Sequence, residues 1–326
     1  MWSGSTASRR WRTGGLIAIP PNPRSELDHA ADEFNLVRPR LFGIAYRMLG
    51  SASEAEDIVQ DVWLRWQAYD RSTVENTAAF LSTTTTRLAI NAGQSARARH
   101  ETYIGPWLPE PVDTSADPAL GAVRGEALGF AVLLLLEKLS PTERAAYVLR
   151  ESFDYPYRQI GEIIEVTEAN ARQLVTRARK HIAAESSAPV STSDHRRLLT
   201  AFVDAAQTGD LEALTALLTA DVVSNSDGGG VKDVLAARIP IMGDERVAKF
   251  VAAFSSHFWT GAQITWVQAN GAPAILLSRD GVRYTLLAAT ATPSGITHLH
   301  WVMNPTKLEG FSRRSAAATA EDSTRG

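Results

Sequence analysis

Residues 162–182, EIIEVTEANARQLVTRARKHI, combine an apolar strip, a short break and a second segment rich in cations. The apolar spacing predicts helices over residues 157–164 and 168–182, separated by a turn with Thr167 as the N-cap of the second helix. A short helix, a tight turn and a longer helix form a helix-turn-helix. The polar side chains expected to point away from the shared apolar face are Asn170, Arg172, Gln173, Thr176, Arg177 and Lys180.

The chemistry of this outward face suits DNA. Arg and Gln form paired hydrogen bonds with guanine and adenine edges, Asn and Thr reach bases or phosphates, and Arg and Lys neutralise phosphate charge. The pattern therefore predicts a DNA-binding helix, with a solvated cationic face as the alternative. Glu165 departs from the usual pattern, because its turn position normally favours glycine for a positive φ.

The overall composition restricts the function classes. The chain has 326 residues, 44% of them hydrophobic, and a net charge of −3, so any affinity for a polyanion must come from local clustering of cations. It has no cysteine, which excludes a disulfide framework, a thiol nucleophile and cysteine-ligated zinc. Neither a metal nor another cofactor is indicated.

The first half of the chain has helical spacing over residues 28–100. Ser53 and Glu56 form the pattern of a capping box, which predicts that a helix begins there. Its outward face carries Asp57, Gln60 and Asp61. A second helix is expected from about residue 78 to residue 100.

Two linkers and a second helical module follow. Residues 101–120 contain four prolines, which favour an extended path. Helical spacing resumes over residues 121–184, where Ser140, Pro141 and Glu143 predict a capped helix start. Residues 185–193, rich in Ser and Ala, are expected to form the second linker.

The last part of the chain, residues 194–311, predicts an α+β domain with helices first and a curved antiparallel sheet after. Helices are expected over 196–207, 211–218 and 246–254, and strands over 262–267, 274–278, 283–290 and 296–303, with RDG at 279–281 as a hairpin turn. Residues 1–27 and 312–326 are expected to be disordered. The longest apolar run, near residues 130–136, is too short to cross a bilayer.

Four blocks of sequence together resemble an extracytoplasmic-function sigma factor. RPRLFGIAYRML (38–49) and SASEAEDIVQDVWLRW (51–66) are similar to sigma region 2, while LSPTERAAYVLRESFDYPYRQIGEII (139–164) and NARQLVTRARKHI (170–182) are similar to region 4. The blocks cover most of residues 34–183. The resemblance implies that region 2 occupies residues 28–100 and region 4 residues 121–184.

Three further motifs resemble those of the sigma-J-like subfamily, whose members carry a C-terminal SnoaL-like domain. They are YIGPWLPEP (103–111), DGGG (227–230) and NPTKL (304–308). Two departures stand out, since Val231 precedes the basic Lys232, and Thr306 replaces the aspartate of the family motif. The residues that the resemblance assigns to regulation are Trp107, Leu108, Pro109, Glu110, Pro111, Asp227, Gly228, Gly229, Gly230, Asn304, Pro305, Lys307 and Leu308.

The resemblance implies a cytoplasmic, multidomain transcription initiation subunit without a membrane partner. Its fold would be two all-α modules followed by an α+β SnoaL-like cone. Asp57, Gln60 and Asp61 would dock on the clamp of core RNA polymerase, and the region 4 helix would bind the −35 promoter element. Candidate contacts to the −10 element are Arg87, Asn91, Arg97 and Arg99. The proline-rich linker would thread the polymerase, or Trp107 would pack on the chain's own C-terminal domain.

The C-terminal domain leaves alternatives open. An acid or histidine in an apolar pocket would suit proton abstraction, and the candidates are Asp204, Asp221, His298 and His300. The chain would then be an isomerase or cyclase with a DNA-binding appendage. A ligand-sensing operator-binding regulator is the other alternative. The favoured interpretation is a non-enzymatic sigma factor whose C-terminal domain regulates it in cis and holds an unidentified small ligand.

Overall fold

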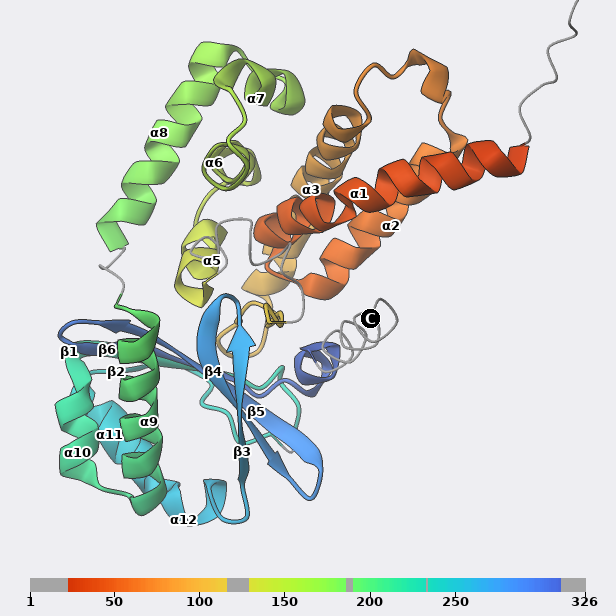
Figure 1. Ribbon diagram of the computed structural model, residues 1–326. Helices are drawn as coiled ribbons and strands as arrows, with labels where there is room; N and C mark the ends of the chain where they lie inside the picture. Colours follow the sequence, from red (N-terminus) through yellow and green to blue (C-terminus); the bar gives the residue numbers. More distant parts are fainter. Residues whose placement is uncertain (1–22, 116–128, 186–189, 233, 312–326) are drawn as a thin grey trace, which may run out of the picture.

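The computed structural model describes residues 23–115, 129–185, 190–232 and 234–311, while the side chains of 23–26, 97, 98 and 185 are left undescribed. The helical half lies above the sheet-containing half in Figure 1, and both helical modules adjoin the same end of that lower half. The expected tail at 312–326 and most of the expected extension at 1–27 lie outside the described residues. A helix begins at Pro23, within the segment expected to be disordered.

The first module is a bundle of three long helices. Its elements are α1 (Pro23–Leu49), α2 (Ala52–Ala68), the 3-10 turn η1 (Arg71–Thr73) and α3 (Thr77–Glu101). The expected capping box at Ser53 is wrong. The N-cap is Ser51, whose hydroxyl accepts from the Glu54 amide, and α2 begins two residues before the predicted position.

The second module contains α5 (Phe130–Glu137), α6 (Pro141–Phe153), α7 (Tyr157–Ile164) and α8 (Glu168–Glu185). The expected capping box of Ser140 and Glu143 is confirmed, with both reciprocal hydrogen bonds present. Because the box satisfies two amides that a helix start leaves without intrahelical partners, α6 begins sharply at Pro141.

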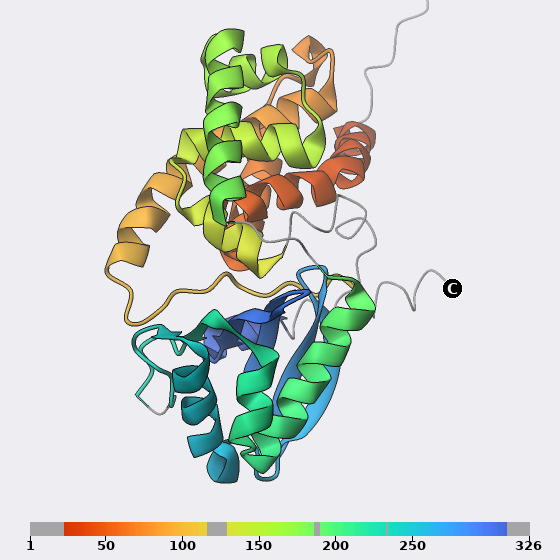
Figure 2. The same ribbon diagram turned by 90° about the vertical axis from the view of Figure 1, so that its left-hand side faces the viewer.

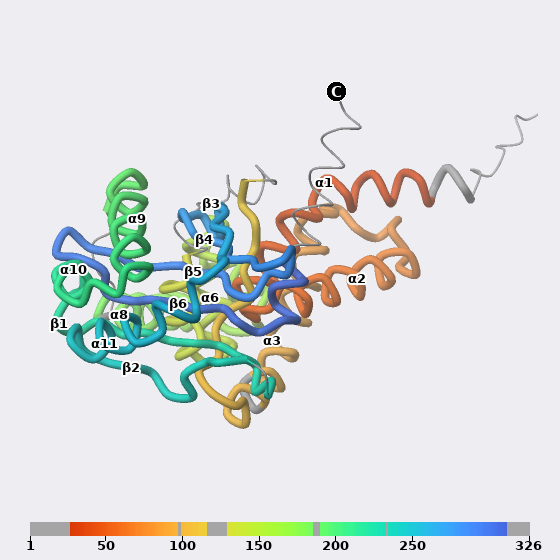
Figure 3. Tube along the Cα trace, turned by 90° about the horizontal axis from the view of Figure 1, so that it is seen from below, coloured from red at the N-terminus to blue at the C-terminus, as the bar shows by residue number. Residues whose placement is uncertain are grey.

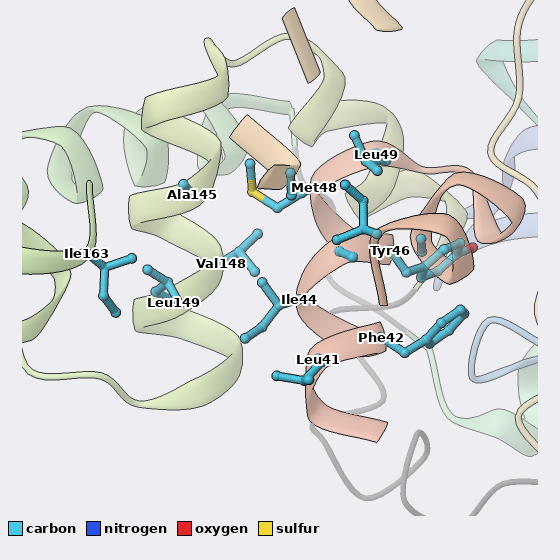
Figure 4. Packing of buried hydrophobic residues seen from close by; sticks show 14 of the residues in the cluster. Leu41, Phe42, Ile44, Tyr46, Met48, Leu49, Ala145, Val148, Leu149 and Ile163 are labelled. Carbon is cyan, nitrogen blue, oxygen red and sulfur yellow. The ribbon is translucent and has the colours of Figure 1, made fainter. Parts of the chain in front are cut away.

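The two helical modules share one hydrophobic core. Figure 4 shows Ile44 and Met48 of α1 facing Val148 and Leu149 of α6. All four side chains are at most 2% exposed. Burial of several such side chains, each contributing about 1.5–3 kcal/mol, holds the modules together in the free chain.

The C-terminal half is an α+β domain, which confirms the expected fold class. It starts with α9 (Thr192–Thr208) and α10 (Leu211–Leu217), and α11 (Asp244–Ala253) and α12 (Ser255–Phe258) follow the second strand. The strands are β1 (Leu218–Asp227), β2 (Ile241–Met242), β3 (Gln263–Ala269), β4 (Ala272–Arg279), β5 (Val282–Thr292) and β6 (Gly295–Val302). The expected RDG hairpin joins β4 to β5, with φ of 51° at Asp280 and 78° at Gly281.

The six-stranded sheet has the order β2-β1-β6-β5-β4-β3. It is mixed, whereas an antiparallel sheet was expected, because β1 pairs with β6 in parallel and every other neighbouring pair is antiparallel. Parallel neighbours need a long crossover. Here α11, α12 and the β3–β5 meander supply it.

The two faces of the sheet have different partners. Helices α9, α10 and α11 pack on one face around Trp301, Leu277 and Leu287. The opposite face packs Leu276 and Leu286 against Leu108 of the linker, Phe130 of α5 and the helical residues 305–311. In Figures 1 and 3 alike, α1 and α2 extend to the side opposite α9–α11.

The linker crosses between the two halves. Figure 2 shows its extended path along the boundary between the helical modules and the sheet. Asp113 forms an isolated antiparallel bridge with Ala269 at the end of β3. The second linker is shorter than expected, because α8 continues to Glu185 and α9 begins at Thr192.

Candidate functional site

The helix-turn-helix has the expected helices and turn. Glu165 ends α7 with a φ of 59°, so a non-glycine residue occupies the left-handed turn position. The Thr167 hydroxyl accepts from the Asn170 amide at 3.2 Å, which confirms Thr167 as the cap. Gly161 was missed by the sequence reasoning: a Cβ there would lie 2.6 Å from the carbonyl oxygen of Val166, so the turn requires a glycine.

The outward face of α8 is accessible. Ala171, Val175 and Ala178 are buried against the other helices. Two of the three cations among the predicted contacts are paired, since Arg172 lies 3.0 Å from Glu168 and Arg177 lies 3.4 Å from Glu143. The predicted DNA contacts, all exposed, are Asn170, Arg172, Gln173, Thr176, Arg177 and Lys180.

Arg87, a predicted −10 contact, holds the helix-turn-helix instead of standing free. Its Nε donates to the Ile163 carbonyl at 2.9 Å, and its Nη2 donates to the Glu162 carbonyl at 3.1 Å. The same Nη2 lies 3.2 Å from the Glu165 carboxylate. The guanidinium therefore satisfies carbonyls at the end of α7, which have lost their helical partners.

The other predicted −10 contacts are spread along α3. Asn91 is exposed, and Arg99 pairs with Glu54 of α2. The side chain of Arg97 lies outside the described residues. The structure therefore brings the four predicted residues onto one helix without assembling them into a single described cluster.

The predicted polymerase-binding face of α2 is exposed at Asp57, Gln60 and Asp61. Gln60 also lines a shallow cavity of about 410 Å³ between α1 and α2, together with Phe34 and Trp63. The face combines acidic groups with the partly exposed ring of Trp63, which suits docking through complementary charge and a small apolar contact.

A buried ion pair holds the linker against the C-terminal domain. The Lys307 ammonium lies 2.7 Å from the Asp227 carboxylate, with the two side chains 7% and 0% exposed. The Leu108 amide donates to Asp227 at 3.0 Å, and Lys307 donates back to the Leu108 carbonyl. Tyr103 donates its hydroxyl proton to Asp227 at 2.6 Å and accepts from Asn304 at 3.0 Å. We call Tyr103, Leu108, Asp227, Asn304 and Lys307 the clasp.

The clasp is a low-dielectric site whose charges depend on each other. Burial lowers the pKa of Lys307, and the adjacent Asp227 carboxylate opposes that shift. Burial and the same carboxylate raise the pKa of Tyr103, so its hydroxyl remains a donor. Removing one charge would leave the other buried without its partner, which typically costs about 3–5 kcal/mol.

Trp107 contacts both halves of the molecule. Its ring stacks on His100 at the end of α3 with centroids 3.9 Å apart, and the Lys307 ammonium lies 4.6 Å from its centre. A Cβ at Gly50 would lie 2.6 Å from the ring, so the end of α1 is shaped to receive it. Trp107 therefore packs on the C-terminal domain and on the first helical module at once.

Glu110 caps α2 from the linker. Its carboxylate accepts from the amides of Ala52 and Ser53 at 3.0 and 2.9 Å, and from the hydroxyls of Ser51 and Ser53 at 2.8 Å each. Anions at a helix N-terminus are stabilised by its free amides and dipole. The start of α2 is thus completed by a residue almost sixty positions away.

Asn270, in the turn between β3 and β4, connects the C-terminal domain to both α1 and the linker. Sequence reasoning missed this residue. Its side chain donates to the Tyr46 hydroxyl at 2.6 Å and accepts from the Val112 amide at 3.1 Å. The Tyr46 hydroxyl in turn donates to the Glu110 carbonyl at 2.6 Å. Asn270 has a φ of 55°, which fits the turn between β3 and β4. Only the topology brings α1, the linker and this turn together.

The glycines of DGGG allow close approach to the clasp. A Cβ at Gly229 would lie 2.6 Å from Asn304, and one at Gly228 would lie 2.7 Å from Ala236. Gly229 also has a φ of 66° and donates its amide to Asp227 at 3.1 Å. The glycines thus form a turn that leaves room for Asn304, which like Asp227 binds the Tyr103 hydroxyl.

The candidate proton-transfer residues do not line the cavity of the C-terminal domain. That cavity, of about 270 Å³, is bounded by residues that include Phe250, Trp259, Arg279, Tyr284 and Trp301. Asp204 and Asp221 are exposed elsewhere. His298 and His300 stack on one strand face as expected, but His300 packs on Phe130, on the face toward the helical half. The four residues proposed for proton transfer therefore lie outside this cavity.

His300 is fully buried, and its surroundings exclude the charged form. Burial, with a smaller contribution from His298, lowers its pKa to about 3. Within the described ranges, no group of three or more His, Cys, Asp or Glu has the arrangement of a metal site. None of the described helices has both the length and the apolar character needed to span a membrane.

Comparisons with known proteins agree with the geometry. The Sigma-70 region 2 family matches residues 34–99, and the Sigma-70 region 4 family matches residues 129–182. The chain is 33% identical over 296 residues to the ECF RNA polymerase sigma factor SigJ of Mycobacterium tuberculosis (strain ATCC 25618 / H37Rv), covering 85% of this chain and 93% of SigJ.

Two further similarities extend over most of the chain. The crystal structure of M. tuberculosis SigJ superposes with a TM-score of 0.69 at 31% identity, covering 86% of this chain and 98% of that one. The probable ECF RNA polymerase sigma factor SigI of M. tuberculosis (strain CDC 1551 / Oshkosh) is 29% identical over 289 residues, which is 87% of this chain and 97% of SigI.

Proposed function

We propose, from the premise that the chain belongs to the extracytoplasmic-function family of RNA polymerase sigma factors, that its C-terminal domain restrains this activity in cis through the clasp. A sigma factor directs transcription initiation by RNA polymerase, and its region 2 and region 4 modules imply binding to the core enzyme and to promoter DNA. The proposal adds how the SnoaL-like domain affects those two modules.

The observation that carries the proposal is that the Lys307–Asp227 pair hydrogen-bonds both the amide and the carbonyl of Leu108. The linker so held also caps α2 through Glu110 and seats Trp107 on His100. It thus favours the arrangement in which α1 packs on α6 and Arg87 binds the helix-turn-helix. Promoter recognition requires region 2 and region 4 to reach two separate elements, so this arrangement must open.

We assign the polymerase contact to Asp57, Gln60 and Asp61. All three lie on the exposed face of α2 beside the shallow cavity at Phe34 and Trp63. Charge-complementary docking through such a face would give a fast, specific encounter.

We assign promoter contacts to two helices. The outward residues of α8 would read the −35 element, since Arg and Gln suit direct readout of bases and Lys suits phosphate contact. For the −10 element we retain Arg87, Asn91, Arg97 and Arg99 on α3. Arg87 would change partners on opening, from the carbonyls of α7 to the nucleic acid.

Run-off transcription with purified core polymerase tests the proposal. The full chain is compared with Lys307→Met, which breaks the clasp, and with Lys249→Met, which removes an exposed lysine of α11. We expect promoter-specific transcripts from all three and a several-fold higher yield from Lys307→Met at limiting sigma factor. Equal yields from Lys307→Met and the wild type would contradict restraint by the clasp. Absence of specific transcripts from every form would contradict the assigned contacts.

A further inference from the structure

The cavity of the C-terminal domain is well formed and unused by the function described so far. Trp259 and Trp301, both 6% exposed, are among the residues that form its inner part, whereas Leu235 and Phe254, at 80% and 38%, lie at its mouth. Its volume of about 270 Å³ approaches the size of small-ligand pockets. Aromatic walls favour a flat, apolar ligand.

The polar groups of the cavity favour a neutral or anionic ligand. Arg279 and His257 line it, and its described lining contains neither Asp nor Glu. Arg279 is fixed in place, since its Nη2 donates to the carbonyls of His257 and Phe258 at 3.1 and 2.9 Å. Its Nε is buried and has no hydrogen-bond partner within the described residues.

The cavity shares a wall with the linker. Ser226 and Val234 line it, and both also line a smaller hollow that contains Ile104 and Gly105 of the linker. Ser226 directly precedes Asp227 of the clasp. Gly228 would clash through a Cβ with Ala236 at 2.7 Å and approach Val234 at 3.2 Å, so this wall has little free space.

From these observations we infer that the cavity binds a small, flat aromatic anion, with its acidic group toward Arg279, and that Ser226 and Val234 transmit its occupancy to the linker. The binding step stands on the cavity alone. The transmission step rests on the proposed regulation in cis, because it acts on the segment that the clasp holds.

The binding step is tested with 1-anilinonaphthalene-8-sulfonate, a flat aromatic anion whose fluorescence rises in apolar sites. Leu235→Glu places a carboxylate at the mouth, and Ile239→Glu is the matched control, because Ile239 is a 73% exposed residue of the same segment that does not line the cavity. We expect saturable one-to-one binding to the full chain, weakened at least tenfold by Leu235→Glu and unchanged by Ile239→Glu. Non-saturable binding, or equal binding by the two variants, would overturn the inference.

The role of the Arg279 guanidinium in binding the acidic group is tested with Arg279→Met and a second probe. N-phenyl-1-naphthylamine has a similar shape but no charge. We expect Arg279→Met to weaken the sulfonate at least tenfold while the neutral probe still binds, which also shows that the cavity remains folded. Arg283→Met, an exposed change at the start of β5, should affect neither probe. Equal loss of both probes would overturn the preference for an anion.

Sedimentation tests whether the mouth of the cavity is instead a contact between two copies of the chain. We expect the same sedimentation from Leu235→Glu and the wild type. If Leu235→Glu converts a dimer to a monomer, the mouth is such a contact, and the ligand site is overturned.

The transmission step is tested by hydrogen exchange of residues 102–108 in the full chain. Exchange there should slow at least twofold when the sulfonate probe is bound. Unchanged exchange with saturated probe would overturn transmission, whatever the transcription assay of Lys307→Met shows.

Discussion

The Arg87 guanidinium binds the carbonyl oxygen of Ile163 at 2.9 Å, so a residue of α3 holds the end of α7 in the helix-turn-helix. This contact makes a predicted promoter-binding residue part of the interface between region 2 and region 4. In the free chain, the same cation cannot hold α7 and contact DNA at once.

Replacing Arg87 should therefore loosen region 4 from region 2. Arg87→Ala removes charge-assisted hydrogen bonds to two carbonyls, each worth about 1.5–3 kcal/mol at most and less at an exposed site. We expect faster hydrogen exchange over residues 157–166. Arg158→Ala, on the exposed side of α7, is the control and should leave exchange unchanged. Identical exchange in both variants would argue against Arg87 as a tie.

The link between the linker and α2 makes a separate prediction. Glu110→Ala removes the acceptor of the Ala52 and Ser53 amides, and loss of such a cap costs about 0.5–2 kcal/mol. The free energy of urea unfolding should fall by that order, whereas Glu75→Ala, in the exposed loop before α3, should change it little. A change of equal size in both variants would refute the capping role.

The start of α2 also shows why the sequence could not predict this cap. Ser53 and Glu56 match the local pattern of a capping box, but Ser51 takes the cap position. Glu110 then binds the free amides from the linker, and Glu56 pairs with Arg38 of α1. Local spacing describes contacts within about four residues and contains no information on a carboxylate that arrives from the linker.

Features that depend only on contacts between neighbouring residues were predictable from the sequence. The helix-turn-helix and the Ser140 capping box depend on neighbouring residues, and both are confirmed. The three subfamily motifs were found in the sequence, yet their convergence on the Asp227–Lys307 pair depends on the parallel placement of β1 beside β6. Likewise, strand alternation put His298 and His300 on one face, but only the packing of α5 reveals which face is buried.

The clasp permits a test of its energetics that is independent of transcription. Lys307→Met should lower the free energy of unfolding by about 3–5 kcal/mol, because the Asp227 carboxylate stays buried without its cation. Adding Asp227→Asn should recover part of this loss, because it removes the unpaired charge and its amide oxygen still accepts from Tyr103, although the position that accepted from the Leu108 amide becomes an amino group. A double mutant as unstable as the sum of the single changes would contradict this coupling.

His300 predicts a loss of stability in mild acid. Its pKa is about 3 in the folded chain, because of burial and the neighbouring His298, and near the ordinary histidine value of 6.5 when unfolded. Between these values the unfolded chain binds the extra proton and the folded chain does not. The free energy of unfolding therefore falls as the pH drops below about 6.5, and the part of this decline that is due to His300 ends near pH 3.

At pH 5 His300 lowers the free energy of unfolding by roughly 2 kcal/mol relative to pH 7, at about 1.4 kcal/mol per pH unit. His300→Leu should flatten the decline in unfolding free energy between pH 7 and pH 5, whereas His181→Leu, an exposed change on α8, should leave the wild-type slope. His300 packs on Phe130 of α5 and shares a hydrogen bond with Thr290 of β5, so this buried neutral ring lies between the helical half and the sheet. A wild-type slope in His300→Leu would assign the acid sensitivity to other groups.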